Sequence, residues 1–206
     1  MRWRTGRRSR NIEDRRRIRV PRKAAGGGIG IIVIALIAMY FGVDPTVILN
    51  QQRSTTSSVS THTTSKPISP ADNQLADFVS VVLADTEDTW RALFQKMGKT
   101  YREPNLVLFS GAVESACGYA QAAMGPFYCP ADQKVYIDLS FYRDLKNRHR
   151  APGDFAQAYV IAHEIGHHVQ TLLGISEKVH TARRRLSQVE GNKLSVRQEL
   201  QADCFS

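Results

Sequence analysis

The sequence has few cysteines, and most of the chain has no excess of charge of either sign. Three cysteines in 206 residues are too few for a small domain stabilised by many disulfides. Hydrophobic residues make up 42% of the chain and charged residues 23%, which excludes a wholly disordered chain and a membrane protein with several spans. We expect one domain with accessory segments, or at most two small domains.

The formal net charge of +9 comes from one end of the chain. Residues 1–23 contain eleven Arg or Lys and two acids, which gives 11 − 2 = +9. Residues 24–206 contain 17 basic and 17 acidic residues and sum to zero. A nucleic-acid-binding face would spread its basic residues over the fold, so we expect no nucleic-acid partner.

A run of 20 residues without charge, Ala24–Val43, follows the basic segment. As a helix it is long enough to cross a bilayer, and basic flanks stay in the cytoplasm. The sequence therefore predicts a basic cytoplasmic tail (1–23), a transmembrane helix (24–43) and a single-pass protein of the cell membrane with an extracytoplasmic catalytic domain. A cleavable signal peptide is the alternative, but the run is long and has no evident cleavage site.

A linker and one folded domain complete the predicted organisation. Residues 44–70 include a stretch rich in Ser and Thr, which is typical of a flexible tether. From residue 71 to about 97, apolar residues recur with helical spacing, and short strands are expected at 105–110 and 134–139. The fold class predicted for 71–206 is therefore α+β.

Cys117 and Cys129 lie in the loop region between the two expected strands. Because the domain is expected outside the cytoplasm, where disulfides persist, we predict that they pair. Two unpaired buried cysteines are the alternative. Cys204 remains, and it is interpreted as a small buried apolar residue.

The pattern that carries chemistry is His163-Glu164-Ile165-Gly166-His167. Pro152-Gly153 breaks the chain, and helical spacing then runs from Asp154, a candidate N-cap, to Gly174. On a helix, His163 and His167 lie one turn apart on one face and can bind one Zn²⁺, while Glu164 can reach a water held there. The alternative is a packed or surface histidine pair.

A catalytic zinc site needs three protein ligands and an open position. Glu199 is the candidate for the third ligand, and Asp203, one helical turn later, can accept the ring N–H of a ligating histidine. Ser195 and Gln198 form a capping box, which predicts that this helix starts there. An acidic pair on a solvated helix face is the alternative. His168 points about 100° away from His167 and is not assigned to the metal.

These motifs resemble a known family. HEIGHHVQ followed by ELQADCFS, together with SACGYAQAAMGPFYCPADQKVYIDLSFY, is similar to the bacterial neutral zinc metallopeptidases, and more broadly to the gluzincins. The resemblance implies a zincin-like domain with a small sheet packed on the HExxH helix. His163, His167 and Glu199 would be metal ligands, Glu164 the base and Asp203 the partner of a histidine. It also implies an edge strand that pairs with extended substrate, for which 134–139 is the candidate.

Family members continue beyond the ELQAD segment, so we expect a C-terminally incomplete domain whose transition-state-stabilising groups lie past Ser206. The predicted function is membrane-anchored, zinc-dependent hydrolysis of peptide bonds in a peptide or protein substrate. Three alternatives stay open: a catalytically silent zinc-binding interaction domain of the envelope, a different zinc hydrolase such as a cell-wall amidase, and a truncated fragment that is inactive or does not fold.

Overall fold

The computed structural model describes residues 2–18, 68–147 and 153–206. The predicted transmembrane segment and most of the predicted linker lie outside these ranges. Within the described ranges, every helix is either too short or too polar to cross a bilayer. Residues 2–18 belong to the same compact unit as the described residues from 68 onward, and only this unit is considered below.

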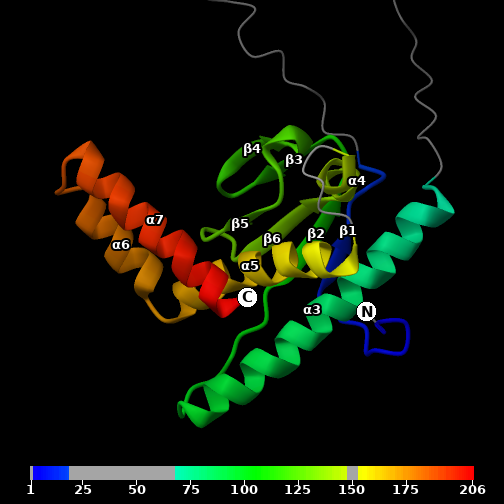
Figure 1. Cartoon of the computed structure of the whole chain (residues 1–206), viewed down its shortest axis with the longest axis horizontal. Coiled ribbons are helices and arrows are strands. Elements are labelled where there is room, and N and C mark those ends of the chain that lie inside the picture. Colours follow the sequence, from blue (N-terminus) through cyan, green and yellow to red (C-terminus); the bar gives the residue numbers. More distant parts are fainter. Residues whose placement is uncertain (1, 19–67, 148–152) are drawn as a thin grey trace, which may run out of the picture. The chain divides into compact units, whose positions relative to one another are not determined.

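The unit is a mixed α+β fold built around a four-stranded sheet (Figure 1). The strand order is β1-β2-β6-β5, and β1, β2 and β6 run parallel while β5 is antiparallel to β6. A second sheet is the antiparallel hairpin β3-β4. The elements are β1 (Ile12–Asp14), α3 (Pro70–Lys96), β2 (Asn105–Phe109), β3 (Ala112–Ser115), β4 (Gly118–Gln121), the 3₁₀ helix η1 (Ala122–Met124), β5 (Phe127–Cys129), β6 (Lys134–Asp138), α4 (Ser140–Asn147), α5 (Asp154–Leu172), α6 (Ile175–Arg183) and α7 (Gln188–Phe205).

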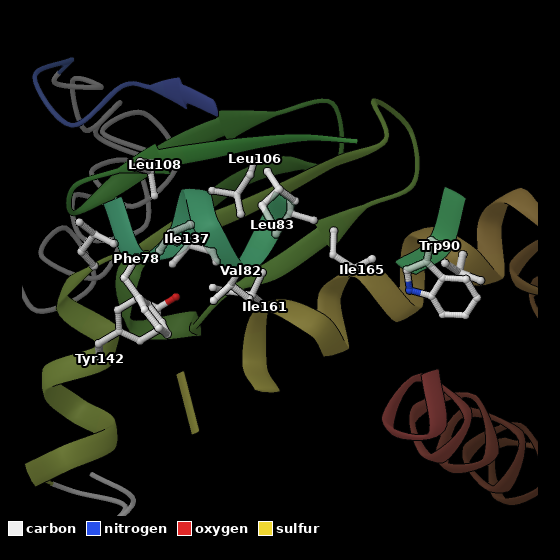
Figure 2. Close-up of a cluster of buried hydrophobic side chains, with 14 of the residues drawn as sticks. Phe78, Val82, Leu83, Trp90, Leu106, Leu108, Ile137, Tyr142, Ile161 and Ile165 are labelled. Carbon is white, nitrogen blue, oxygen red and sulfur yellow. The ribbon is translucent and has the colours of Figure 1, made fainter. Parts of the chain in front are cut away.

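Both faces of the main sheet are buried, and side chains along its strands alternate between the two faces. Leu106, Leu108 and Ile137 point to one face, where they pack with residues of α3 and α5 (Figure 2). Val107 and Phe109 point to the other face, where a smaller cluster includes residues of the β3-β4 hairpin. The central strands therefore pack against α5 and hold it in place.

Helix α3 has the bounds that its apolar spacing predicts. Ser69 caps it by accepting a hydrogen bond from the Asp72 backbone N–H, and Pro70 occupies the first turn, where its missing N–H costs nothing. Phe78, Val82 and Leu83 on this helix are buried against the sheet and α5. These contacts make α3 the main support of the face that carries α5.

The structure places the N-terminal arm, defined as residues 2–18, in the folded unit, whereas the sequence analysis had treated 1–23 as a separate tail. Strand β1 of the arm pairs in parallel with β2, with Ile12 opposite Leu106. Trp3, Arg8 and Glu13 of the arm contact partners 69–121 positions away, and no local pattern reveals such contacts.

Cys117 and Cys129 are joined by a disulfide, which connects the turn between β3 and β4 to β5. The loop region between 111 and 130 contains β3, β4, η1 and β5, none of which the sequence analysis predicted. Their strands have three or four residues each, so period-two patterns in this region are too short to detect. Cys204 is exposed, which contradicts its interpretation as a buried apolar residue.

One predicted cap and one predicted helix start are wrong, although helix α5 begins at Asp154, where its helical spacing begins. Helix α5 has Gly153 as its N-cap, and no side chain caps it. Helix α7 begins at Gln188 with Ser187 as its cap, so Ser195 lies inside the helix. The Ser195 hydroxyl donates to the Gly191 backbone oxygen four residues earlier, which is how serine is accommodated within a helix.

Candidate metal centre

Helix α5 places the two histidines of the motif one turn apart. Its inward face, formed by Ile161, Ile165 and Val169, is completely buried and fixes the rotation of the helix. His163 and His167 then point toward α7, with ring centroids 4.7 Å apart. Both histidine side chains are about 20% exposed, so a ligand can still reach them.

Glu199 of α7 completes a cluster with these histidines. Its Oε2 atom lies 3.4 Å from His163 Nε2 and 3.2 Å from His167 Nε2. Ligands about 2.0–2.1 Å from a tetrahedral Zn²⁺ lie roughly 3.3 Å from one another, so the donor set and its spacing fit that ion. One ligand atom from each residue lies within 4.8 Å of the others, and the three residues could hold a metal.

A glycine lets the two ligand helices approach closely. A Cβ added at Gly166 would lie 2.7 Å from the Ala202 carbonyl oxygen and 3.1 Å from its Cα. Gly166 and Ala202 are both buried at this crossing. The fourth position of the motif, two residues after Glu164, is thus filled by a residue without a side chain, which brings Glu199 within reach of the histidines.

The Nδ1 atom of each histidine has its own hydrogen-bonding partner. His163 Nδ1 lies 2.8 Å from Asp203 Oδ1, and the Tyr159 hydroxyl donates to the same oxygen at 2.5 Å. His167 Nδ1 lies 3.0 Å from the side-chain oxygen of Gln170. In both cases the Nδ1–H can donate outward, which leaves Nε2 as the acceptor that faces Glu199.

Gln170 is fully buried and also connects the two helices. Its amide nitrogen donates to the Gln198 backbone oxygen at 2.7 Å and to the Gln201 side-chain oxygen at 3.1 Å. Gln170 is not among the site residues that the sequence predicts. The signal that could have found it is its position three residues after His167, on the same face of α5.

Glu164 is a residue of α5, and its side chain faces strand β5. Its residue is 8% exposed, and burial raises the pKa of its carboxyl to about 7. The Tyr128 backbone hydrogen-bonds this carboxyl and acts in the opposite direction. A carboxyl whose pKa lies near neutrality can both take up and release a proton at that pH.

His168 holds β5 on α5 and does not join the cluster. Its Nδ1 lies 3.1 Å from the Tyr128 hydroxyl, and its Nε2 lies 2.6 Å from the Arg102 backbone oxygen. The side chain is completely buried, which lowers its pKa to about 4. Neutral His168 therefore donates to the carbonyl oxygen and accepts from the tyrosine.

Two cavities border the cluster. One of about 700 Å³ is lined by His167 and Glu199 together with residues of β5, α6 and α7. Another of about 310 Å³ is lined by His163, Glu164 and Asp203 together with Tyr159 and the segment around Gly125. The cluster is thus accessible from two hollows with different linings.

The family model described as "Putative neutral zinc metallopeptidase" matches residues 1–206. The chain belongs to this family. It is 50% identical over 217 residues to the "Uncharacterized protein YpfJ" of Escherichia coli (strain K12), with 100% of this chain and 73% of the relative covered. It is 37% identical over 172 residues to the "Uncharacterized protein Rv2575" of Mycobacterium tuberculosis (strain ATCC 25618 / H37Rv), with 82% of this chain and 56% of the relative covered. No solved structure gives a significant match.

Family membership agrees with the zinc metallopeptidase resemblance that the motifs indicate. The structure also brings all five predicted site residues on α5 and α7 into one place: His163, Glu164, His167, Glu199 and Asp203. It does not place the expected edge strand at 134–139. Strand β6 lies between β2 and β5, so β5 is the strand at that edge of the described sheet.

Proposed function

We propose that the protein is a zinc-dependent peptidase whose ligands are His163, His167 and Glu199 and whose base is Glu164. The single observation that carries this proposal is the position of a buried carboxyl beside a three-ligand cluster of the His-His-Glu type. The zincin-like arrangement, with α5 under an edge strand, supports the same conclusion.

Bound Zn²⁺ would supply Lewis acidity, polarising the scissile carbonyl and lowering the pKa of a water. Glu164 accepts the proton of the attacking water and returns it to the nitrogen of the leaving amine. Asp203 and Gln170 hold the rings of His163 and His167, respectively, in the orientation that keeps both Nε2 atoms directed at the ion.

An extended peptide or protein segment is the substrate class that suits this site. Strand β5 lies at the edge of the sheet and contacts α5, so an added strand would pass beside Glu164. The two cavities then offer separate places for side chains of the substrate. Pairing through the backbone favours broad sequence tolerance, with preference set by the cavity linings.

The test is the variant Glu164→Gln, assayed against a mixed library of quenched fluorescent peptides. Hydrolysis should fall about 10²–10⁴-fold because general-base catalysis is lost, while elemental analysis should still find zinc. Asp85→Asn on the exposed face of α3 is a charge-matched control and should keep full activity. Equal activity of Glu164→Gln and the parent would exclude Glu164 as the base. Bound zinc without hydrolysis by the parent would instead favour a silent zinc-binding domain.

A further inference from the structure

The N-terminal arm completes the main sheet. Strand β1 pairs with β2, and its backbone bonds extend beyond the strand: the Leu106 N–H donates to the Asn11 oxygen at 2.8 Å, and the Arg15 N–H donates to the Leu108 oxygen at 2.7 Å (Figure 1). Trp3 packs edge-on against Phe78 of α3. The arm is therefore joined to the domain by backbone pairing as well as by side chains.

A buried acid in the domain depends on the arm for its partners. Glu87 of α3 is 1% exposed, and its carboxylate accepts hydrogen bonds from Ser9, from Asn11 at 2.9 Å and from Arg7 at 2.9 Å. A buried carboxylate without such partners is strongly unfavourable. Among the described residues, the donors to the Glu87 carboxylate all belong to the arm.

The charges of the arm and the domain are complementary. Arg7 pairs with Asp88, and Arg8 forms a two-pronged bond with Asp77 at 2.9 and 2.7 Å. In one further pair the arm supplies the acid and the domain the base: Glu13 pairs with Lys134 of β6 at 2.5 Å. Three acids of α3, Asp77, Glu87 and Asp88, are thus partners of arginines more than 65 positions earlier.

These contacts have a consequence for membrane topology. A single crossing by residues 24–43 would separate the arm from the domain by about 30 Å of hydrocarbon, and β1 could not pair with β2 of the same chain. We propose that the N-terminal arm and the metal-binding domain lie in the same compartment, on one side of any membrane that the intervening residues contact. The inference stands apart from the proposed function, because it uses no residue of the metal centre.

The basic character of the arm does not oppose this proposal. Positive flanking residues fix orientation by remaining on the cytoplasmic side. In the folded unit, Arg7, Arg8, Arg15 and Arg16 are each paired with a carboxylate. Arg7 and Arg8 pair with acids of α3, whereas Arg15 and Arg16 pair with acids of the arm itself.

A cysteine crosslink tests the docking of the arm directly. A Cβ built at Gly6 lies 3.8 Å from Val81 Cβ, which matches the spacing of a disulfide. We expect Gly6→Cys with Val81→Cys, in a full chain that also carries Cys204→Ser, to crosslink in intact cells after mild oxidation. The matched control pairs Gly6→Cys with Gln95→Cys, fourteen residues along the same helix and about 21 Å away.

Peptide mass mapping measures the crosslink. At least about tenfold more crosslink in the Val81 pair than in the Gln95 pair is expected, since only the first pair satisfies disulfide geometry. Equal yields in the two pairs would overturn the docking of the arm, and the proposal with it.

Labelling from one side of the membrane tests the compartment. Arg10→Cys in the arm and Lys99→Cys in the domain are both at exposed positions and leave the metal centre untouched. Each variant also carries Cys204→Ser, because the free Cys204 is exposed and would react as well. We expect a membrane-impermeant maleimide to label both variants in whole cells, or neither until the cells are lysed. Labelling of one variant only in intact cells would place arm and domain on opposite sides and would refute the proposal.

Discussion

The metal centre and the arm interface are held together in different ways. At the metal centre, each functional side chain follows from a spacing of three or four residues on α5 or α7, and only one contact between helices has to form. At the arm interface, Arg7 and Arg8 meet acids about 70–80 positions later, and β1 has only three residues. Motifs of fixed spacing can be found by inspection, whereas pairs brought together by the fold cannot.

The acids of the metal centre and of the arm interface differ in their exposure to solvent. Glu199 is 57% exposed and open to a ligand, whereas Glu87 is buried and hydrogen-bonded within the protein. An exposed acid beside two histidines serves binding, and a buried acid surrounded by donors serves stability. The predictions below separate these two roles.

The largest effect is expected for Glu199→Ala. Loss of the third ligand should weaken zinc binding by more than the 10–100-fold typical of outer partners, and stoichiometry by elemental analysis should fall well below one per chain. Glu190→Ala, an exposed acid on the same helix, serves as the control and should bind zinc like the parent. Undiminished zinc in Glu199→Ala would remove Glu199 from the ligand set.

Glu87→Ala should destabilise the fold without changing the metal centre. Removing the buried carboxylate leaves the buried Ser9 hydroxyl without its acceptor and takes away one of the two acceptors of the Asn11 amide, so the free energy of unfolding should fall by about 3 kcal/mol. Urea unfolding measures this change. Asp88→Ala removes an exposed partner of the same Arg7 and should cost less than about 1 kcal/mol. Similar losses of unfolding free energy in both variants would mean that the burial of Glu87 adds nothing to its contribution to stability.

Gln170→Leu should weaken zinc binding about 10–100-fold, because His167 loses the acceptor that orients its ring. Competition with a chelator measures the affinity. Gln201→Leu is the matched control, since it removes a hydrogen bond of Gln170 but leaves the one to His167. If both variants lose affinity equally, Gln170 acts through helix packing and not through His167.

The smallest effect is the pH dependence of the arm contacts. The hydrogen bond from Arg8 lowers the pKa of Asp77 below its usual value of 3.8. Because the folded-state pKa is depressed, the contribution of this pair is complete above about pH 4 and is lost as the pH falls through the lowered pKa. The difference in urea stability between the parent and Asp77→Asn should therefore be constant from pH 5 to 7 and shrink below pH 4. A difference that persists in acid would argue against this ion pair.

Much of the site could be predicted from the sequence because its residues lie on helices. A helix fixes the relative direction of His163 and His167, and likewise of Glu199 and Asp203, whatever surrounds it. The start of α7 was mispredicted because Ser195 and Gln198 also satisfy a capping pattern inside a helix. Gln170 was missed because an amide carries no motif until its partner is known.

The residue pattern is enough to predict α3, the two central strands, the residues of the candidate metal centre and their pairing within each helix. Local spacing decides these features, since helices and strands present side chains at fixed periods. Three other features emerge only in the folded chain: β5 and not β6 forms the edge of the described sheet, Gly166 allows α7 to approach, and the arm joins the sheet. These features depend on burial and pairing between distant segments, whose free energy exists only once the core has formed.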